Sequence, residues 1–265
     1  MKRVRLFVTG KAEEALPAAL KRLFPAASFT AGRWCNARGN QEGGFTSTRL
    51  VPSARTQRAE RLLGEMVGSV MRGGDADYAI FLDDLELANH GCESDVCAYF
   101  RQAATVLART KSKPTVRALR ERISVHLLAP MLEAYLLADP GCWSAAGLVS
   151  SVVPKLRPGA PEKFATDDPN YLAAPAGTDY RCIHPKEYMQ HLVQRGGGTY
   201  SEATQGMRAL EAVDLRRAWG SPHARWHLIG ALIDDVADML GVPALTPARF
   251  LAPTSHSQGT VLRNL

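Results

Sequence analysis

The run Tyr78-Ala79-Ile80-Phe81-Leu82 constrains the fold more than any other part of the chain. It is apolar and has no polar break, which is typical of a strand buried on both faces and indicates a place in the middle of a parallel sheet. Asp83, Asp84 and Glu86 follow directly. The rest of the chain must therefore cover both faces of this strand and leave its carboxyl end open to solvent or to a cation.

Other apolar patterns alternate between strands and helices along the first half of the chain. Residues 4–8 and 123–128 predict two further buried strands. Helical spacing of apolar residues predicts helices over 11–24, 55–71, 94–108 and 131–138, with a shorter candidate over 117–121. The order predicts an α/β fold, with a mostly parallel sheet flanked by helices on both faces. Residues 28–54, rich in Gly and Asn, are expected to form a long loop or hairpin.

The pattern changes after Asp139, where Pro and Gly become frequent. Helices are predicted over 185–194, 201–210 and 225–240, and residues 254–265 are expected to be a frayed tail. The last helix is apolar apart from Asp234 and Asp235, one of which we expect to point outward in a structural or interface role. The predicted organisation is an α/β core over 1–140, an irregular linker or arm over 141–184, and a helical C-terminal part over 185–265 that packs on the core.

Composition excludes several classes of protein. The 265 residues are 46% hydrophobic and 22% charged, which excludes a mainly disordered or fibrous chain. Residues 6–8 form too short an apolar run for a signal peptide, and no stretch is long enough to span a membrane, so we expect a cytoplasmic protein. Five cysteines without a Cys-x-x-Cys pair indicate free thiols. A zinc site at His90, Cys92 and Cys97 is the alternative, but it lacks a distal ligand pair.

The formal net charge of +6 favours polyanionic partners, although only weakly. Basic residues crowd the first 40 positions and form a second cluster: Arg101, Arg109, Lys111, Lys113, Arg117, Arg120 and Arg122. Bound nucleic acid or nucleotide is a hypothesis that charge alone does not decide.

The carboxylates Asp83, Asp84 and Glu86 lie where ligands bind in doubly wound sheets, outside the carboxyl ends of the strands. Carboxylates there are costly unless they are solvated or neutralised. Mg²⁺ takes oxygen ligands of this kind, and Asp84-x-Glu86 is similar to a D-x-D metal motif. The alternative is a polar strand end that caps the following segment.

The turn after the first strand is expected at the same edge of the sheet. Backbone N–H groups at Gly10 and the charge of Lys11 would hold a phosphate there. The chain has no P-loop pattern. Glu13 and Glu14 are also explained by compensation of the helix dipole.

Two charged residues further along are candidates for the same site. Glu133 lies in an otherwise apolar helix, so its carboxylate requires either a metal or a basic partner. Lys186 stands at a helix start, where the dipole disfavours a cation unless it faces an anion or the carboxylate cluster. A solvated lysine is the alternative for Lys186, and Asp139 before Pro140 is interpreted as a helix terminator.

Three segments resemble TOPRIM-like proteins. Phe7-Val8-Thr9-Gly10-Lys11-Ala12-Glu13-Glu14 is similar to their opening V-E-G-x-T-E-E, and Leu82-Asp83-Asp84-Leu85-Glu86 to their second acidic motif. Leu132-Glu133-Ala134-Tyr135-Leu136-Leu137-Ala138-Asp139 resembles the E-A-W/L-L-x-A-D segment of a bacterial TOPRIM-like family related to the nuclease half of OLD-type (overcoming lysogenisation defect) proteins. Members are often encoded beside ABC-type ATPases in phage-defence settings. The resemblance spans residues 4–140 and, more faintly, 225–241.

This resemblance implies a nuclease that cleaves phosphodiester bonds with Mg²⁺ or Mn²⁺. It implies metal ligation by Asp84 and Glu86, beside Asp83, with Glu13 and Glu133 completing the acidic shell and Lys186 stabilising transition-state charge. The expected partners are nucleic acid, DNA ahead of RNA, an ABC-type ATPase and a second copy of the chain, with no membrane.

One departure from the family pattern bears on activity. Thr9 stands where TOPRIM enzymes carry a glutamate that is usually catalytic. Either Glu13 replaces it, or metal binding is weakened, or the chain is a non-catalytic subunit that binds an ATPase or nucleic acid. A metal-dependent phosphohydrolase of small nucleotides is the third hypothesis.

Overall fold

The computed structural model describes residues 1–35, 40–51, 57–71, 73–173, 180–218, 228–245 and 259–265. Its centre is a four-stranded, all-parallel sheet in the order β2-β1-β3-β4. The strands are β1 (Arg3–Val8), β2 (Ser28–Arg33), β3 (Tyr78–Asp84) and β4 (Ile123–Leu128). The α/β fold predicted from the sequence is thus confirmed, and β3 lies between β1 and β4 as its apolar run indicates.

The strand β2 corrects the expectation of a loop or hairpin over residues 28–54. It pairs in parallel with β1, from Arg3 opposite Ser28 to Val8 opposite Arg33. As an edge strand it is nowhere fully buried, so its sequence, Ser28-Phe29-Thr30-Ala31-Gly32-Arg33, lacks the continuous apolar pattern of an inner strand. Because Gly and Asn residues follow β2, the whole segment resembles a loop in the sequence.

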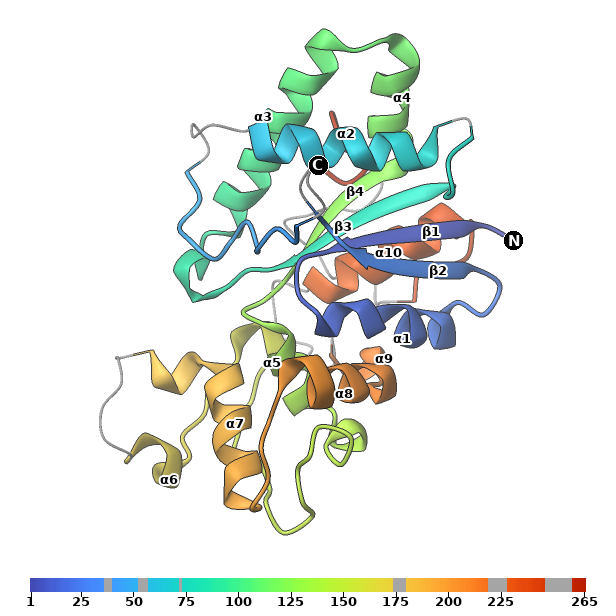
Figure 1. The fold of residues 1–265 in the computed structure, drawn as a ribbon. Helices are drawn as coiled ribbons and strands as arrows, with labels where there is room; N and C mark the ends of the chain where they lie inside the picture. Colours follow the sequence, from blue (N-terminus) through green and yellow to red (C-terminus); the bar gives the residue numbers. More distant parts are fainter. Residues whose placement is uncertain (36–39, 52–56, 72, 174–179, 219–227, 246–258) are drawn as a thin grey trace.

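Helices cover both faces of the sheet (Figure 1). One face carries α2 (Gln57–Val70), α3 (Glu93–Thr110) and α4 (Lys113–Arg122). The other face carries η1 (Ala12–Ala15), α1 (Leu16–Leu23) and α10 (Leu228–Leu240). The side chains of β3 alternate between the two cores, Phe81 on the α2 side and Ile80 and Leu82 on the α1 side, as the two-residue period of a strand requires.

The chain after β4 builds a second layer beneath α1. It contains α5 (Leu132–Ala138), α7 (Pro185–Arg195), the π-helical turn η6 (Glu202–Gly206), α8 (Met207–Ala212) and α9 (Leu215–Ala218), with α6 (Pro169–Leu172) at its periphery. Short 3-10 turns η3 (Pro140–Cys142), η4 (Pro161–Lys163) and η5 (Arg181–Ile183) connect these helices, as η2 (Leu87–Asn89) connects β3 to α3. Apolar residues of this layer and of α1 belong to one continuous hydrophobic core. In the described part of the chain, no helix combines the length and hydropathy that a membrane crossing requires.

The C-terminal residues 259–265 lie along the edge of β4, which corrects the expectation of a frayed tail for this part of residues 254–265. Residues 254–258 lie outside the described residues. The Asn264 amide donates to the Val125 carbonyl at 2.6 Å, and its oxygen accepts from the Val125 N–H at 3.0 Å. The backbone N–H of Arg263 donates to the carbonyl of Ile123 at 2.8 Å. The tail thereby pairs backbone groups that the edge strand would otherwise expose.

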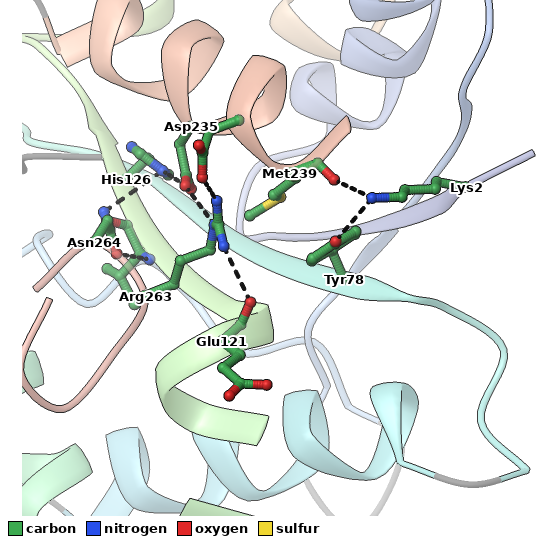
Figure 2. A network of polar contacts seen from close by, with 10 residues as sticks. Lys2, Tyr78, Glu121, His126, Asp235, Met239, Arg263 and Asn264 are labelled. Atoms are coloured by element: carbon green, nitrogen blue, oxygen red, sulfur yellow. Dashed lines mark hydrogen bonds and ion pairs between the residues drawn. The ribbon is translucent and has the colours of Figure 1, made fainter. Parts of the chain in front are cut away.

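A buried polar network anchors this tail to α10 (Figure 2). The His126 ring contacts the Asp235 carboxylate, Nε2 to Oδ2, at 2.9 Å, and Arg263 donates to the other oxygen of Asp235 at 2.8 Å. Asp234 and Asp235 are both buried, so the expectation that one of them points outward was wrong. The physical reason is that α10 packs against β4, where the buried Asp235 is compensated by His126 and Arg263.

We predict that Asn264→Ala lowers the free energy of unfolding by about 2–4 kcal/mol, because it leaves both buried backbone groups of Val125 unpaired. Urea denaturation followed by circular dichroism measures this change. Asn170→Ala, at an exposed position, is the matched control and should change stability by less than about 0.5 kcal/mol. Equal effects of the two substitutions would contradict the role assigned to Asn264.

Candidate active site

A small cavity of about 120 Å³ opens at the carboxyl ends of β1 and β3. It combines the loop after β1, the end of β3 and the starts of α5, α7 and η6. Its walls are polar and mostly acidic: Thr9, Gly10, Glu13, Gly44, Asp83, Asp84, Glu86, Met131, Glu133, Lys186 and Glu202. The structure thus brings together Gly10 and all the predicted acidic residues from three separate segments of the chain, with Lys186 from a fourth beside them.

Asp83 ties the walls of the cavity together. Its Oδ1 accepts a hydrogen bond from the Thr9 hydroxyl, and its Oδ2 accepts from the backbone N–H of Phe45 at 2.7 Å and from the Thr46 hydroxyl at 3.3 Å. Both oxygens are therefore engaged by the protein. Asp83, which the sequence suggested as a metal ligand, holds residues 44–46 against the strand end.

Glu13 and Asp84 present carboxylate oxygens without hydrogen-bond partners. Glu13 is 3% exposed on η1, and its Oε2 and the Oδ1 of Asp84 are buried atoms with no partner among the described residues. Gly10 makes room for Glu13, because a Cβ atom at Gly10 would lie 2.2 Å from that same Oε2. The sequence suggested Gly10 as part of a phosphate cradle; in the structure it lies directly against an acidic side chain.

Glu86 occupies a strained backbone position at the edge of the cavity. Its φ of 58° is the one positive value among the described residues other than glycine, and conformations of this kind cost on the order of 1–3 kcal/mol. Its backbone N–H donates to the carbonyl of Pro130 at 2.9 Å, which fixes the chain direction after β3. The surrounding structure therefore supports a turn that keeps the Glu86 carboxylate at the cavity.

Glu133 and Lys186 each have a partner that the sequence did not reveal. The Tyr200 hydroxyl donates to Oε1 of Glu133 at 3.0 Å, and the Lys186 ammonium forms an ion pair with Glu202. Tyr200 and Glu202 precede or begin the π-helical turn η6. In the sequence, Glu202 is an ordinary acidic residue in the first turn of a helix, so no local signal identifies it.

The electrostatics of the cavity favour protonated carboxyl groups when nothing neutralises them. Burial raises the pKa of Glu13 to about 8, and the charges of Glu202 and Glu133 add to the increase. Burial also raises the pKa of Glu133 to about 7, against the opposing effect of Lys186. The pKa of Asp84 rises well above its usual range through burial and through the charges of Glu13 and Glu133. A cation or a cationic group would reverse these shifts.

Lys11 and Glu14 lie outside the cavity, although the sequence suggested Lys11 as a phosphate ligand. Lys11 forms an ion pair with Glu14, whose other oxygen accepts from Arg33 at 3.0 Å. Partial burial raises the pKa of Glu14, but the hydrogen bonds and charges of Lys11 and Arg33 outweigh it and lower the pKa overall. These three residues form a separate ion-pair cluster.

The carboxylate oxygens of the cavity are ligands of the kind that a hard cation prefers. Two of these oxygens are buried and have no hydrogen-bond partner among the described residues. In the described part of the chain, however, no group of three or more His, Cys, Asp or Glu side chains is already arranged to hold a metal ion. Cation binding therefore requires the carboxyl groups to close in on the ion. The same finding gives no support to zinc at His90, Cys92 and Cys97.

Comparison with known proteins identifies no relative of this chain. No family model matches it, no curated protein matches it, and no solved structure matches it.

We predict that, with a chelator present, the stability of the protein falls as pH rises from about 4.5 to about 8. The folded-state pKa of Glu13 is raised from 4.5 to about 8, so its contribution is fully present below pH 4.5 and is lost as the buried carboxyl ionises. Thermal denaturation in EDTA between pH 5 and pH 8 measures the decline. Glu13→Gln should flatten it, because the amide does not ionise.

Glu14→Gln is the control for this measurement, because the pKa of Glu14 is lowered and not raised. Its stability should decline with pH at least as steeply as that of the wild type. A decline of the same steepness in Glu13→Gln and the wild type would contradict the assignment.

Proposed function

We propose that the protein is a cation-dependent phosphodiesterase that hydrolyses nucleic acid at the acidic cavity. The observation that carries the proposal is the pair of unpartnered buried oxygens on Glu13 and Asp84, in a cavity that Glu86, Glu133 and Lys186 also line. Carboxylates are kept together at such a cost in desolvation chiefly where function requires it. The resemblance of the acidic segments to TOPRIM-like nucleases supports the same reaction class.

Glu13 and Asp84 would hold the cation, with Glu86 as a further ligand. A bound Mg²⁺ or Mn²⁺ would supply an activated water and stabilise charge on the leaving oxygen. Asp83 has a positioning role, because it fixes Thr9 and residues 45–46 at the rim. TOPRIM enzymes carry a glutamate at the position of Thr9, whereas here the Thr9 hydroxyl donates a hydrogen bond to Asp83. In this proposal, Glu13 supplies the carboxylate that Thr9 lacks.

Glu133 and Lys186 would act on the substrate. With a pKa of about 7, Glu133 is suited to accept a proton from water near neutral pH, and Tyr200 holds its Oε1 in place. The ammonium of Lys186 lies in the same cavity and would stabilise charge on the phosphate oxygens.

We predict that the double variant Asp84→Ala, Glu86→Ala loses at least about 100-fold in cleavage rate, because it removes two candidate ligands. The assay uses plasmid, single-stranded DNA and RNA with Mg²⁺ or Mn²⁺. The matched control is Asp167→Ala, Glu211→Ala, which removes two exposed carboxylates elsewhere and should cleave like the wild type. Cleavage that survives the first double variant would overturn the proposed site.

Lys186→Ala should lower the cleavage rate by about 10²–10³-fold, since it removes the cation nearest the carboxylates. Lys186→Arg should recover part of the rate, because it keeps the charge and changes only its geometry. The rates are compared under saturating substrate, with circular dichroism to verify folding. Equal rates for Lys186→Ala and the wild type would exclude the role in charge stabilisation.

A catalytically degenerate subunit is the second candidate function. It is favoured by Thr9 in place of an acidic residue and by the lack of a preformed set of three metal ligands in the described residues. Unchanged nucleic-acid binding without any cleavage would favour it. Because an ABC-type ATPase is among the proposed partners, a pull-down from cells accompanies a negative cleavage result.

A further inference from the structure

Helix α4 lies on the far side of the sheet from α7 (Figure 1). A second charged hollow lies against α4. It has a volume of about 730 Å³ and is formed by the end of α3, the length of α4 from Lys113 to Glu121, and Gly259 of the C-terminal tail. Its lining is Ala108, Lys111, Lys113, Val116, Arg117, Arg120, Glu121 and Gly259. We call this surface the basic hollow.

The cations of the basic hollow are poorly neutralised. Arg117 is paired with Glu121 at 2.9 Å. Lys111, Lys113 and Arg120 are exposed and have no ion pair within the described ranges. Lys113, Arg117 and Arg120 are spaced four and three residues apart, so they lie on one face of α4. Like charges held this close repel one another, and a polyanion would relieve that repulsion.

The lining indicates the kind of polyanion. Protein interfaces depend on buried aromatic and large apolar anchors, and membrane-binding surfaces insert such residues. Beside its charged residues, the basic hollow is lined only by the small residues Ala108, Val116 and Gly259. Long, flexible cations around a polar depression match the repeated phosphates of a nucleic-acid backbone.

We propose that the basic hollow binds the phosphate backbone of nucleic acid, at a position separate from the acidic cavity. The choice of nucleic acid over other polyanions rests on the proposed function. The acidic cavity lies at the carboxyl ends of the strands, whereas the hollow adjoins the α4 end that leads into the start of β4. The hollow therefore holds phosphates other than the one that is cleaved, and it contributes affinity without contributing to the chemical step.

The test measures binding of a fluorescein-labelled 30-base-pair duplex by anisotropy, in EDTA and over a range of salt concentrations. The triple variant Lys111→Ala, Lys113→Ala, Arg120→Ala should bind at least about tenfold more weakly than the wild type at 100 mM salt. The slope of log K against log salt should fall in magnitude by about 2–3, close to one for each phosphate contact that is lost.

The control variant Lys155→Ala, Arg157→Ala, Lys163→Ala removes the same charge from exposed positions elsewhere. It should keep the wild-type salt slope. Equal losses in the two triple variants would overturn the proposal, because net charge alone would then explain the binding. The proposal would also be overturned if the variant Lys111→Ala, Lys113→Ala, Arg120→Ala bound the duplex with wild-type affinity.

Cleavage kinetics separate this inference from the proposed function. The hollow variant should raise KM at least about tenfold and keep kcat at saturating substrate, because the acidic cavity is unchanged. A lower kcat at an unchanged KM would contradict the separate site. If the wild type binds the duplex through the basic hollow but does not cleave it, the proposed nuclease function is rejected. The proposal that the basic hollow binds nucleic acid is then retained.

Discussion

Desolvation of the carboxylates around the end of β3 is the constraint on which the rest of the structure depends. Asp83 and Asp84 end a strand whose preceding residues are buried on both sides. Asp83 is buried, and Asp84 is half-buried with its Oδ1 away from solvent. The protein compensates Asp83 with donors from Thr9 and from residues 45–46. One carboxylate oxygen of Asp84 and one of Glu13 have no hydrogen-bond partner among the described residues. That difference distinguishes Asp83 from the two carboxylates that we propose as cation ligands.

The lower helical layer supplies polar partners to the same group of carboxylates. Glu133 on α5 adds another buried charge beside Asp84, and α7 and η6 bring Lys186, Glu202 and Tyr200 to meet it. A buried carboxylate is tolerated when hydrogen bonds and opposite charges replace water. The second half of the chain therefore completes the electrostatics of the first half as well as covering its apolar face.

A second buried charge, on α10 beside the edge strand β4, is compensated in a different way. Asp235 on α10 contacts His126 and Arg263, and the charge and hydrogen bonds of these partners hold its pKa below the usual range despite its burial. Both oxygens of Asp235 are engaged, which makes this network an anchor for the C-terminal tail. In the acidic cavity, by contrast, Glu13 and Asp84 each keep one buried oxygen without a partner, which is the observation behind the proposed cation site.

The central strand and its acidic end could be predicted from the residue pattern alone, because an unbroken apolar run followed by carboxylates has few other structural solutions. Glu133 and Lys186 stand out in the sequence because each charge conflicts with its local pattern. Glu13 suits the first turn of a helix, so only the resemblance to TOPRIM-like proteins marked it as a candidate. Only the tertiary structure decided where Tyr200 and Glu202 lie, because nothing in their neighbourhood conflicts with an ordinary helix. Strand β2 and the paired tail were likewise decided by contacts with distant residues, since edge elements are half-covered and carry no periodic apolar signal.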